Sequence, residues 1–222
     1  MTAVEDPGPS DIAAAQELIE AELVIQGSEL ALSPVGVAPA LAQTTQNPAE
    51  ARAGAYTLDS EHSKVTWSVT HLGFSTYIGQ FHGVTGTLKI DPARLDATEL
   101  KVTIDTNLVG TFSPGLDKHL KAPDFLDTAK FPTATFTSTG VKRTGERTAD
   151  VTGDLTLHGV TRPVTFQATF NQAGVNMVDK QYSLGFDGKA TIKRSDFGIT
   201  TYVPAVSDEV TLKFAAEFKA VP

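Results

Sequence analysis

Two segments with strand-like alternation end in side chains that can titrate or bind a ligand. In the stretch KVTWSVTH (64–71), Trp67 and two valines share one face with His71, which closes that row. Further along, a similar row ends at Ile192 and places Arg194 next on the same face. An imidazole can donate or accept a hydrogen bond, and a guanidinium binds phosphate or carbonyl oxygens through forked donors. We therefore expect His71 and Arg194 at the mouth of a pocket, because a polar group there loses less hydration free energy than one deep inside.

Structural roles for the same residues stay open. His71 can be a core histidine bonded to a backbone carbonyl, and Trp67 can be ordinary core. Arg194 can form an ion pair with one of three acids, which are Asp117, Asp196 and Asp208.

The residue types that support metal binding or catalysis do not form a recognisable motif. The five histidines contain no HExxH or HxH pair, and Asp117 and His119 are spaced too closely to share a helix face. The chain has no GxSxG turn, no glycine-rich phosphate loop and no cysteine. We therefore expect no catalytic residue, no metal site and no cofactor.

Charge and aromatic residues divide the chain unevenly. Residues 1–54 hold 8 of the 26 acids and 1 of the 18 bases, which leaves 18 acids and 17 bases in residues 55–222. All aromatic residues lie at or after Tyr56. A nearly neutral domain has no basic surface for a phosphate backbone, so nucleic acid is not an expected partner. No run of 18 apolar residues exists, so no transmembrane helix is expected.

The first 55 residues are expected to lie outside the core. The stretch LALSPVGVAPALAQ (30–43) is typical of the end of a secretory signal, but acids rather than bases precede it. It is therefore either a degraded or mis-started signal or a disordered acidic tail. Residues 44–55 are typical of a polar linker.

From Tyr56 the chain alternates apolar and polar residues, which indicates half-buried strands. A change of phase near Gly83 predicts a bulge, and residues 113–126 suit a short helix after Pro114-Gly115. One-sided burial in short strands is typical of an antiparallel barrel or sandwich, and eight strands favour a barrel. We predict an all-β, eight-stranded antiparallel barrel over 56–222, with the helix between strands three and four and strands at about 56–71, 77–91, 100–104, 134–140, 151–157, 164–170, 182–192 and 210–218.

The inward rows contain many small residues. A filled core has the density of an organic crystal, so small inward residues favour an unfilled space at the centre of the barrel. The alternative is that the aromatic residues and the helix fill it. These small residues are Gly86, Ala134, Ser138, Gly140, Gly153, Ala168, Gly188 and Ala190.

Four separated segments resemble the YceI-like proteins, which are bacterial polyisoprenoid-binding proteins with a lipocalin-like barrel. They are YTLDSEHSKVTWSVTHLGFSTYIGQFHGVTGTLKID, LDKHLKAPDFLDTAKFPTATFTS, GDLTLHGVTRPVTF and IKRSDFGI, in the order that the family shows. The resemblance covers about residues 56–218. It implies a long apolar channel for an isoprenoid lipid or isoprenoid quinone, a homodimer, and a periplasmic or secreted location, with a cytoplasmic one as the alternative.

Individual residues match the family's motifs. His71 matches the histidine after the first strand, Asp117 and His119 match the D-x-H-L helix, and Arg194 opens the R-S-D-F-G segment. Leu116 stands where the family often has an arginine, which removes one cation that could bind a head group. We expect His71, Arg194, Asp117 and His119 as polar ligand contacts at the channel mouth.

We predict binding or carriage of an isoprenoid lipid, either a quinone tail or a polyprenyl phosphate, without catalysis. The alternative is a stress-related structural or interaction protein with a filled barrel and no lipid. The expected channel wall consists of Trp67, Phe74, Phe81, Phe112, Leu116, Leu120, Phe125, Phe136, Leu155, Phe166, Phe186, Ile192 and Phe197.

Overall fold

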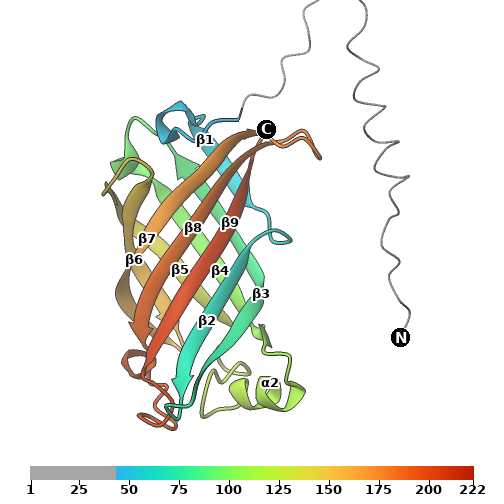
Figure 1. Cartoon of the computed structure of the whole chain (residues 1–222), viewed down its shortest axis with the longest axis vertical. Coiled ribbons are helices and arrows are strands. Elements are labelled where there is room, and N and C mark those ends of the chain that lie inside the picture. The colour runs from blue at the N-terminus through green and yellow to red at the C-terminus, as the bar shows by residue number, and fades with distance from the viewer. Residues whose placement is uncertain (1–43) are drawn as a thin grey trace, which may run out of the picture. The chain divides into compact units, whose positions relative to one another are not determined.

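The computed structural model describes residues 44–222, and these fold into one twisted, closed β-barrel (Figure 1). The barrel has one α-helix, α2 (Pro114–Leu120), and three 3-10 helices, η1 (Pro48–Glu50), η2 (Leu95–Ala97) and η3 (Arg194–Phe197). Its strands are β1 (Gly54–Leu58), β2 (Lys64–His71), β3 (Ser75–Ile90), β4 (Glu99–Gly110), β5 (Thr133–Arg143), β6 (Thr148–Leu157), β7 (Val160–Val175), β8 (Tyr182–Lys193) and β9 (Glu209–Ala220).

The strands close the sheet through antiparallel neighbours. The order is β1-β3-β2-β9-β8-β7-β6-β5-β4, and β3 pairs with β4 to complete the ring. Both β1 and β2 pair with β3 on one side and with β9 on the other. β1 and β2 therefore share the single strand position between β3 and β9, one after the other. The nine strands form an eight-stranded barrel, as predicted.

The prediction of one continuous strand over 56–71 was wrong. The chain leaves the ladder between Leu58 and Lys64, where the Asp59 carboxylate accepts a hydrogen bond from the amide of Glu61 at 3.0 Å. An aspartate that bonds the backbone two residues ahead stabilises a local turn that competes with the ladder. Apolar and polar residues alternate on both sides of this turn, so the sequence pattern did not reveal the break between the two strands.

The predicted bulge and helix are both present. The pairing of β3 with β4 shifts register between Phe81 and Gly83, which is the position of the phase change in the sequence. The extra residue moves the inward row to the other parity. Helix α2 begins at Pro114, a favoured first helical residue, and ends at Leu120, so it is shorter than the expected 113–126.

The fold begins before the expected boundary at residue 56. Thr45 pairs with Ala173 on β7 through two backbone hydrogen bonds of 2.8 Å, and Arg147 donates to the side chain of Gln46 at 3.2 Å. The segment 44–53 therefore packs on the barrel instead of acting as a linker. The signal-like stretch 30–43 lies outside the described residues.

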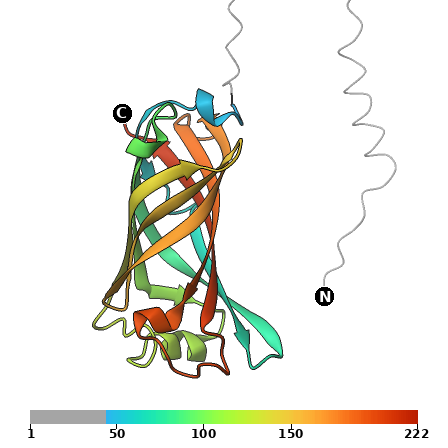
Figure 2. The same ribbon diagram turned by 90° about the vertical axis from the view of Figure 1, so that its left-hand side faces the viewer.

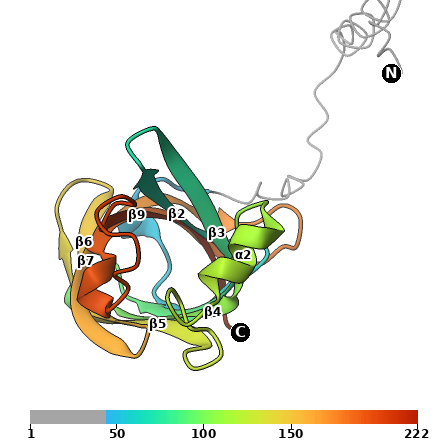
Figure 3. The ribbon, with the colours of Figure 1, turned by 90° about the horizontal axis from the view of Figure 1, so that it is seen from below.

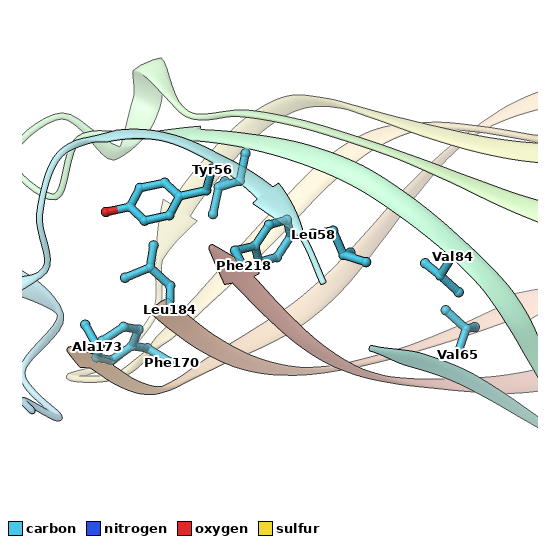
Figure 4. Close-up of a cluster of buried hydrophobic side chains, with 9 residues drawn as sticks. Tyr56, Leu58, Val65, Val84, Phe170, Ala173, Leu184 and Phe218 are labelled. Atoms are coloured by element: carbon cyan, nitrogen blue, oxygen red, sulfur yellow. The ribbon is translucent and has the colours of Figure 1, made fainter. Parts of the chain in front are cut away.

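A cluster of buried apolar side chains includes residues of β1 and of the strands around it (Figure 4). Leu184 is fully buried, and Tyr56 and Phe218 pack beside it from β1 and β9. The hydroxyl of Tyr56 donates to the carbonyl of Arg52 at 2.6 Å. Burial raises the pKa of Tyr56 to about 12, so the phenol stays neutral in this end of the core.

Candidate functional site: an apolar cavity in the barrel

A cavity of about 720 Å³ lies inside the barrel. That volume is within the range of roughly 300–1,000 Å³ found for small-molecule sites. Its lining is largely aliphatic and aromatic, and ten of the residues expected in the channel wall contribute to it. They are Trp67, Phe81, Leu116, Leu120, Phe125, Phe136, Leu155, Phe166, Phe186 and Ile192.

Three phenylalanines on alternate strands line one part of the cavity wall. Phe136 on β5, Phe166 on β7 and Phe214 on β9 pack edge to face, with ring centroids 5.4 and 5.2 Å apart. The strands between them carry Gly153 and Gly188, and a Cβ at either position would overlap the ring of Phe136 or Phe214. The inward glycines therefore accommodate neighbouring rings, and only part of the space they leave belongs to the cavity.

Trp67 forms a similar ring-over-glycine contact on β2, the strand next to β9. Its indole lies over Gly79 on β3, and its ring stacks with Tyr77 at a centroid distance of 6.4 Å. The indole Nε1 is buried and has no hydrogen-bond acceptor among the described residues. A buried donor without an acceptor is uncommon, and here it adds one polar group to an apolar wall.

His71 lies where the cavity meets solvent. It closes β2, lines the cavity and is exposed, as is Ser75 across the β2–β3 hairpin. His71 also forms an isolated bridge with Val206, which precedes β9. The end of the barrel that carries α2 therefore has an opening flanked by His71 and Ser75.

Arg194 borders the cavity, and four of its five N–H groups donate to acceptors within the protein. The guanidinium donates to the carbonyls of Ser207, Ile199, Thr201 and Val206 at 2.9, 3.2, 2.8 and 2.9 Å. The side chain is buried, and this burial lowers the pKa of Arg194. Arg194 therefore holds the loop between η3 and β9 around itself, and its role as a cation presented to a head group stays a prediction.

Asp117 and His119 do not line the cavity. The Asp117 carboxylate accepts from the amide and hydroxyl of Thr111 at 2.8 and 2.6 Å, which ties α2 to the end of β4. The His119 ring packs edge-on against Phe125 at 4.8 Å. Both residues position the α2 segment, so the expectation of polar contacts at the mouth is corrected for them.

Three aromatic residues expected in the wall lie elsewhere. Phe74 and Phe112 are 89% and 98% exposed, because they occupy a hairpin tip and the turn before α2, where strand alternation no longer applies. Phe197 is buried in η3 but does not reach the cavity. Its carbonyl accepts a hydrogen bond from the Nδ1 of His158 at 3.1 Å, so it fastens η3 to the β6–β7 turn.

A charged cluster that the sequence did not predict lies beside the β1–β2 turn. Lys219 donates to Asp59 and Asp179 at 2.7 Å each, and His62 contacts Asp59 at 2.8 Å and Glu217 at 3.6 Å. Asp59, His62 and Glu217 are close enough to hold a metal ion. Because an ammonium group already contacts the Asp59 carboxylate, we interpret the cluster as an ion-pair network.

Comparison with known proteins identifies the domain. The YceI-like domain matches residues 56–218, which is most of the chain. The chain belongs to the YceI-like domain family. A UPF0312 protein from Pseudomonas savastanoi pv. phaseolicola is 44% identical over 162 residues, which cover 72% of this chain and 84% of the relative. Another, from Pseudomonas fluorescens, is 43% identical over 164 residues, which cover 73% and 84%.

Solved structures share the YceI-like fold. Burkholderia cenocepacia BcnA is 29% identical with a TM-score of 0.66, and the match covers 72% of this chain and 98% of BcnA. A polyisoprenoid binding domain from Saccharophagus degradans is 18% identical with a TM-score of 0.57, covering 77% and 100%. The resemblance seen in the sequence is thereby confirmed. Among the residues that the structure describes, no helix is long and apolar enough to span a membrane.

Proposed function

We propose that this YceI-like barrel binds an isoprenoid lipid in its cavity and carries it without chemical change. The observation that carries the proposal is a cavity of about 720 Å³ walled by aromatic and aliphatic side chains. The polyisoprenoid binding domain of Saccharophagus degradans, which has the same fold, supports this choice of ligand class. Quinone and polyprenyl phosphate are both retained as head-group classes.

The length of the barrel suits a linear tail. Strand β8 has 12 residues, and at about 3.4 Å per residue and a tilt near 40° it extends roughly 30 Å along the barrel axis. Apolar burial contributes roughly 25 cal/mol per Å², so a chain enclosed over this length binds with few polar contacts. With Arg194 occupied by carbonyls, we expect the tail rather than the head group to dominate affinity.

The proposal includes three further expectations. The lipid is bound rather than converted, because the cavity wall presents few polar groups to a reacting atom. The chain is expected in the periplasm or outside the cell, which fractionation checks. A homodimer also stays a prediction, and sedimentation velocity measures it.

The first experiment is to purify the full chain from bacteria under native conditions, extract it with organic solvent and analyse the extract by mass spectrometry. A stoichiometric isoprenoid is expected, and its mass distinguishes a quinone from a polyprenyl phosphate. Trp67, the single tryptophan, reports uptake of added isoprenoid through its fluorescence because its ring lines the cavity. An empty extract together with unchanged fluorescence would overturn the proposal in favour of an interaction protein.

A further inference from the structure

Large apolar side chains are exposed around one end of the barrel. Five of them lie on the connections at the α2 end, and we call them the apolar collar. They are Leu72, Phe74, Phe112, Tyr202 and Val203, which are 51%, 89%, 98%, 58% and 37% exposed. Exposed apolar residues are ordinary when scattered, but a group of them at one end of a molecule marks an interaction surface.

The collar comes from three segments that are distant in sequence and neighbours in space. The β2–β3 hairpin carries Leu72, whose amide donates to the carbonyl of Ala205 at 2.8 Å in the loop before β9. In that loop, the Tyr202 ring lies 6.1 Å from Phe125, which follows α2. Figure 3 shows the hairpin, α2 and this loop at the same end of the barrel, and Figure 2 shows the hairpin leaning outward.

The backbone holds several collar residues in an unfavourable conformation. Leu72, Phe112 and Tyr202 have φ of 52°, 60° and 61°, in the left-handed region that bulky side chains rarely adopt. Such a residue destabilises the backbone locally, and strain of this kind concentrates at functional sites. An exposed position without a function does not require a bulky apolar residue in this conformation.

Residues beside the collar line the cavity at this end of the barrel. His71 and Ser75, which flank two collar residues in the hairpin, are exposed and also line the cavity. On the α2 side, Leu116 and Leu120 line the cavity just after the exposed Phe112. The exposed apolar collar and the cavity lining are therefore adjacent in sequence, both in the β2–β3 hairpin and beside α2.

We propose that the apolar collar docks on the surface of a lipid bilayer and places the cavity opening against it, so that a lipid passes between membrane and barrel without crossing water. This inference rests on the proposed function, since its value to the protein depends on a membrane-derived cargo. Side chains such as Phe and Leu enter the boundary between head groups and acyl chains, and Tyr suits the interface itself.

Shape and charge favour a bilayer over a second copy of this chain. A stable protein interface needs a complementary face that buries about 1,200–2,000 Å² in total, whereas the collar consists of separate protrusions around an opening. The segments 71–75, 111–121 and 198–208 carry two lysines and two aspartates, so their formal charges balance. Insertion should therefore depend on apolar burial, and binding should persist at high salt.

The test is sedimentation of the full chain with phosphatidylcholine vesicles at low and high salt. The collar variant combines Phe74→Ser with Phe112→Asn, because asparagine tolerates the left-handed backbone at position 112. The control combines Met177→Ser with Val178→Ser, which removes two residues that are 80% and 86% exposed in the β7–β8 connection at the opposite end. Thermal unfolding followed by circular dichroism confirms that each variant folds.

We expect wild type and control to sediment with vesicles at both salt concentrations. The vesicle-bound fraction of the collar variant should be lower by about tenfold or more. Equal partitioning of folded collar variant and wild type would overturn the inference. The inference would also be overturned if wild type did not sediment with vesicles and formed a dimer that the collar substitutions dissociate. The collar would then be a contact between copies of the chain.

Mass spectrometry of the same preparations separates this inference from the proposed function. Bound isoprenoid in all three proteins, without collar-dependent sedimentation, leaves the function standing and rejects docking. Collar-dependent sedimentation without any bound isoprenoid supports the docking surface and rejects the proposed cargo.

Discussion

The indole of Trp67 on β2 covers the backbone of Gly79 on β3, its direct partner in the ladder, so closely that a Cβ at position 79 would overlap the ring. Glycine at this position lets the largest side chain of the cavity wall lie flat against the sheet. The space that the ring would otherwise occupy stays available inside the barrel.

Gly79→Ala should therefore reduce lipid uptake, because its methyl group forces the Trp67 ring toward the cavity. Overpacking of this kind costs about 1–3 kcal/mol, so isoprenoid affinity should fall about tenfold. Titration followed by Trp67 fluorescence measures the change. Gly140→Ala is the control, since a Cβ there meets no atom within 4 Å. Wild-type affinity in Gly79→Ala would show that the ring position does not limit the cavity.

Filling the cavity from the wall should displace the lipid. Ala190 is buried and lines the cavity, whereas the next residue, Thr191, is exposed on the outer face of β8. We expect Ala190→Phe to reduce the isoprenoid that co-purifies with the protein by about tenfold, while Thr191→Phe leaves it unchanged. Mass spectrometry of extracts gives the ratio. Equal lipid content in the two folded variants would place the ligand outside the barrel.

Arg194→Met should destabilise the fold more than it changes ligand preference. The substitution removes four hydrogen bonds from a buried guanidinium to backbone carbonyls. We expect a loss of about 2–4 kcal/mol in the free energy of unfolding, measured by urea denaturation. Lys193→Met, one residue earlier and exposed, should be nearly neutral. Unchanged stability with selective loss of phosphate-headed lipid would instead make Arg194 a head-group contact.

Asp59 should make stability depend on acid pH. Burial alone would raise the pKa of Asp59, but hydrogen bonds from Lys219 and His62 hold it well below its ordinary value. A depressed carboxyl pKa stabilises the fold above the unfolded value of about 3.9, and this contribution is lost as pH falls toward the folded pKa.

Asp59→Asn should therefore lower the melting temperature at pH 5–7 and flatten its decline below about pH 4. Thermal unfolding between pH 2 and 7 measures both effects. Asp154→Asn, on an exposed position of β6, is the control and should follow wild type. Parallel wild-type and Asp59→Asn profiles over this range would mean that the network does not stabilise the folded state.

Much of the barrel could be predicted from the sequence because alternation is a local property. Within a strand, successive side chains face opposite sides, so Trp67, Phe166 and Ile192 could be assigned to the inward face before any pairing was known. The bulge beside Gly83 was also local, since an extra residue reverses the parity of the row. Family motifs then identified the fold.

Alternation stops being informative where a strand ends, and only the tertiary structure decided what lies beyond. Phe74 and Phe112 are exposed because connections at the α2 end turn them outward, partly through left-handed backbone. Arg194 follows Ile192 in parity, yet the loop before β9 folds around its guanidinium. The Asp59–Lys219 ion pair likewise joins residues from opposite ends of the domain. The sequence determined which residues of a strand face inward. The three-dimensional packing of the loops determined where the residues beyond the strand ends lie.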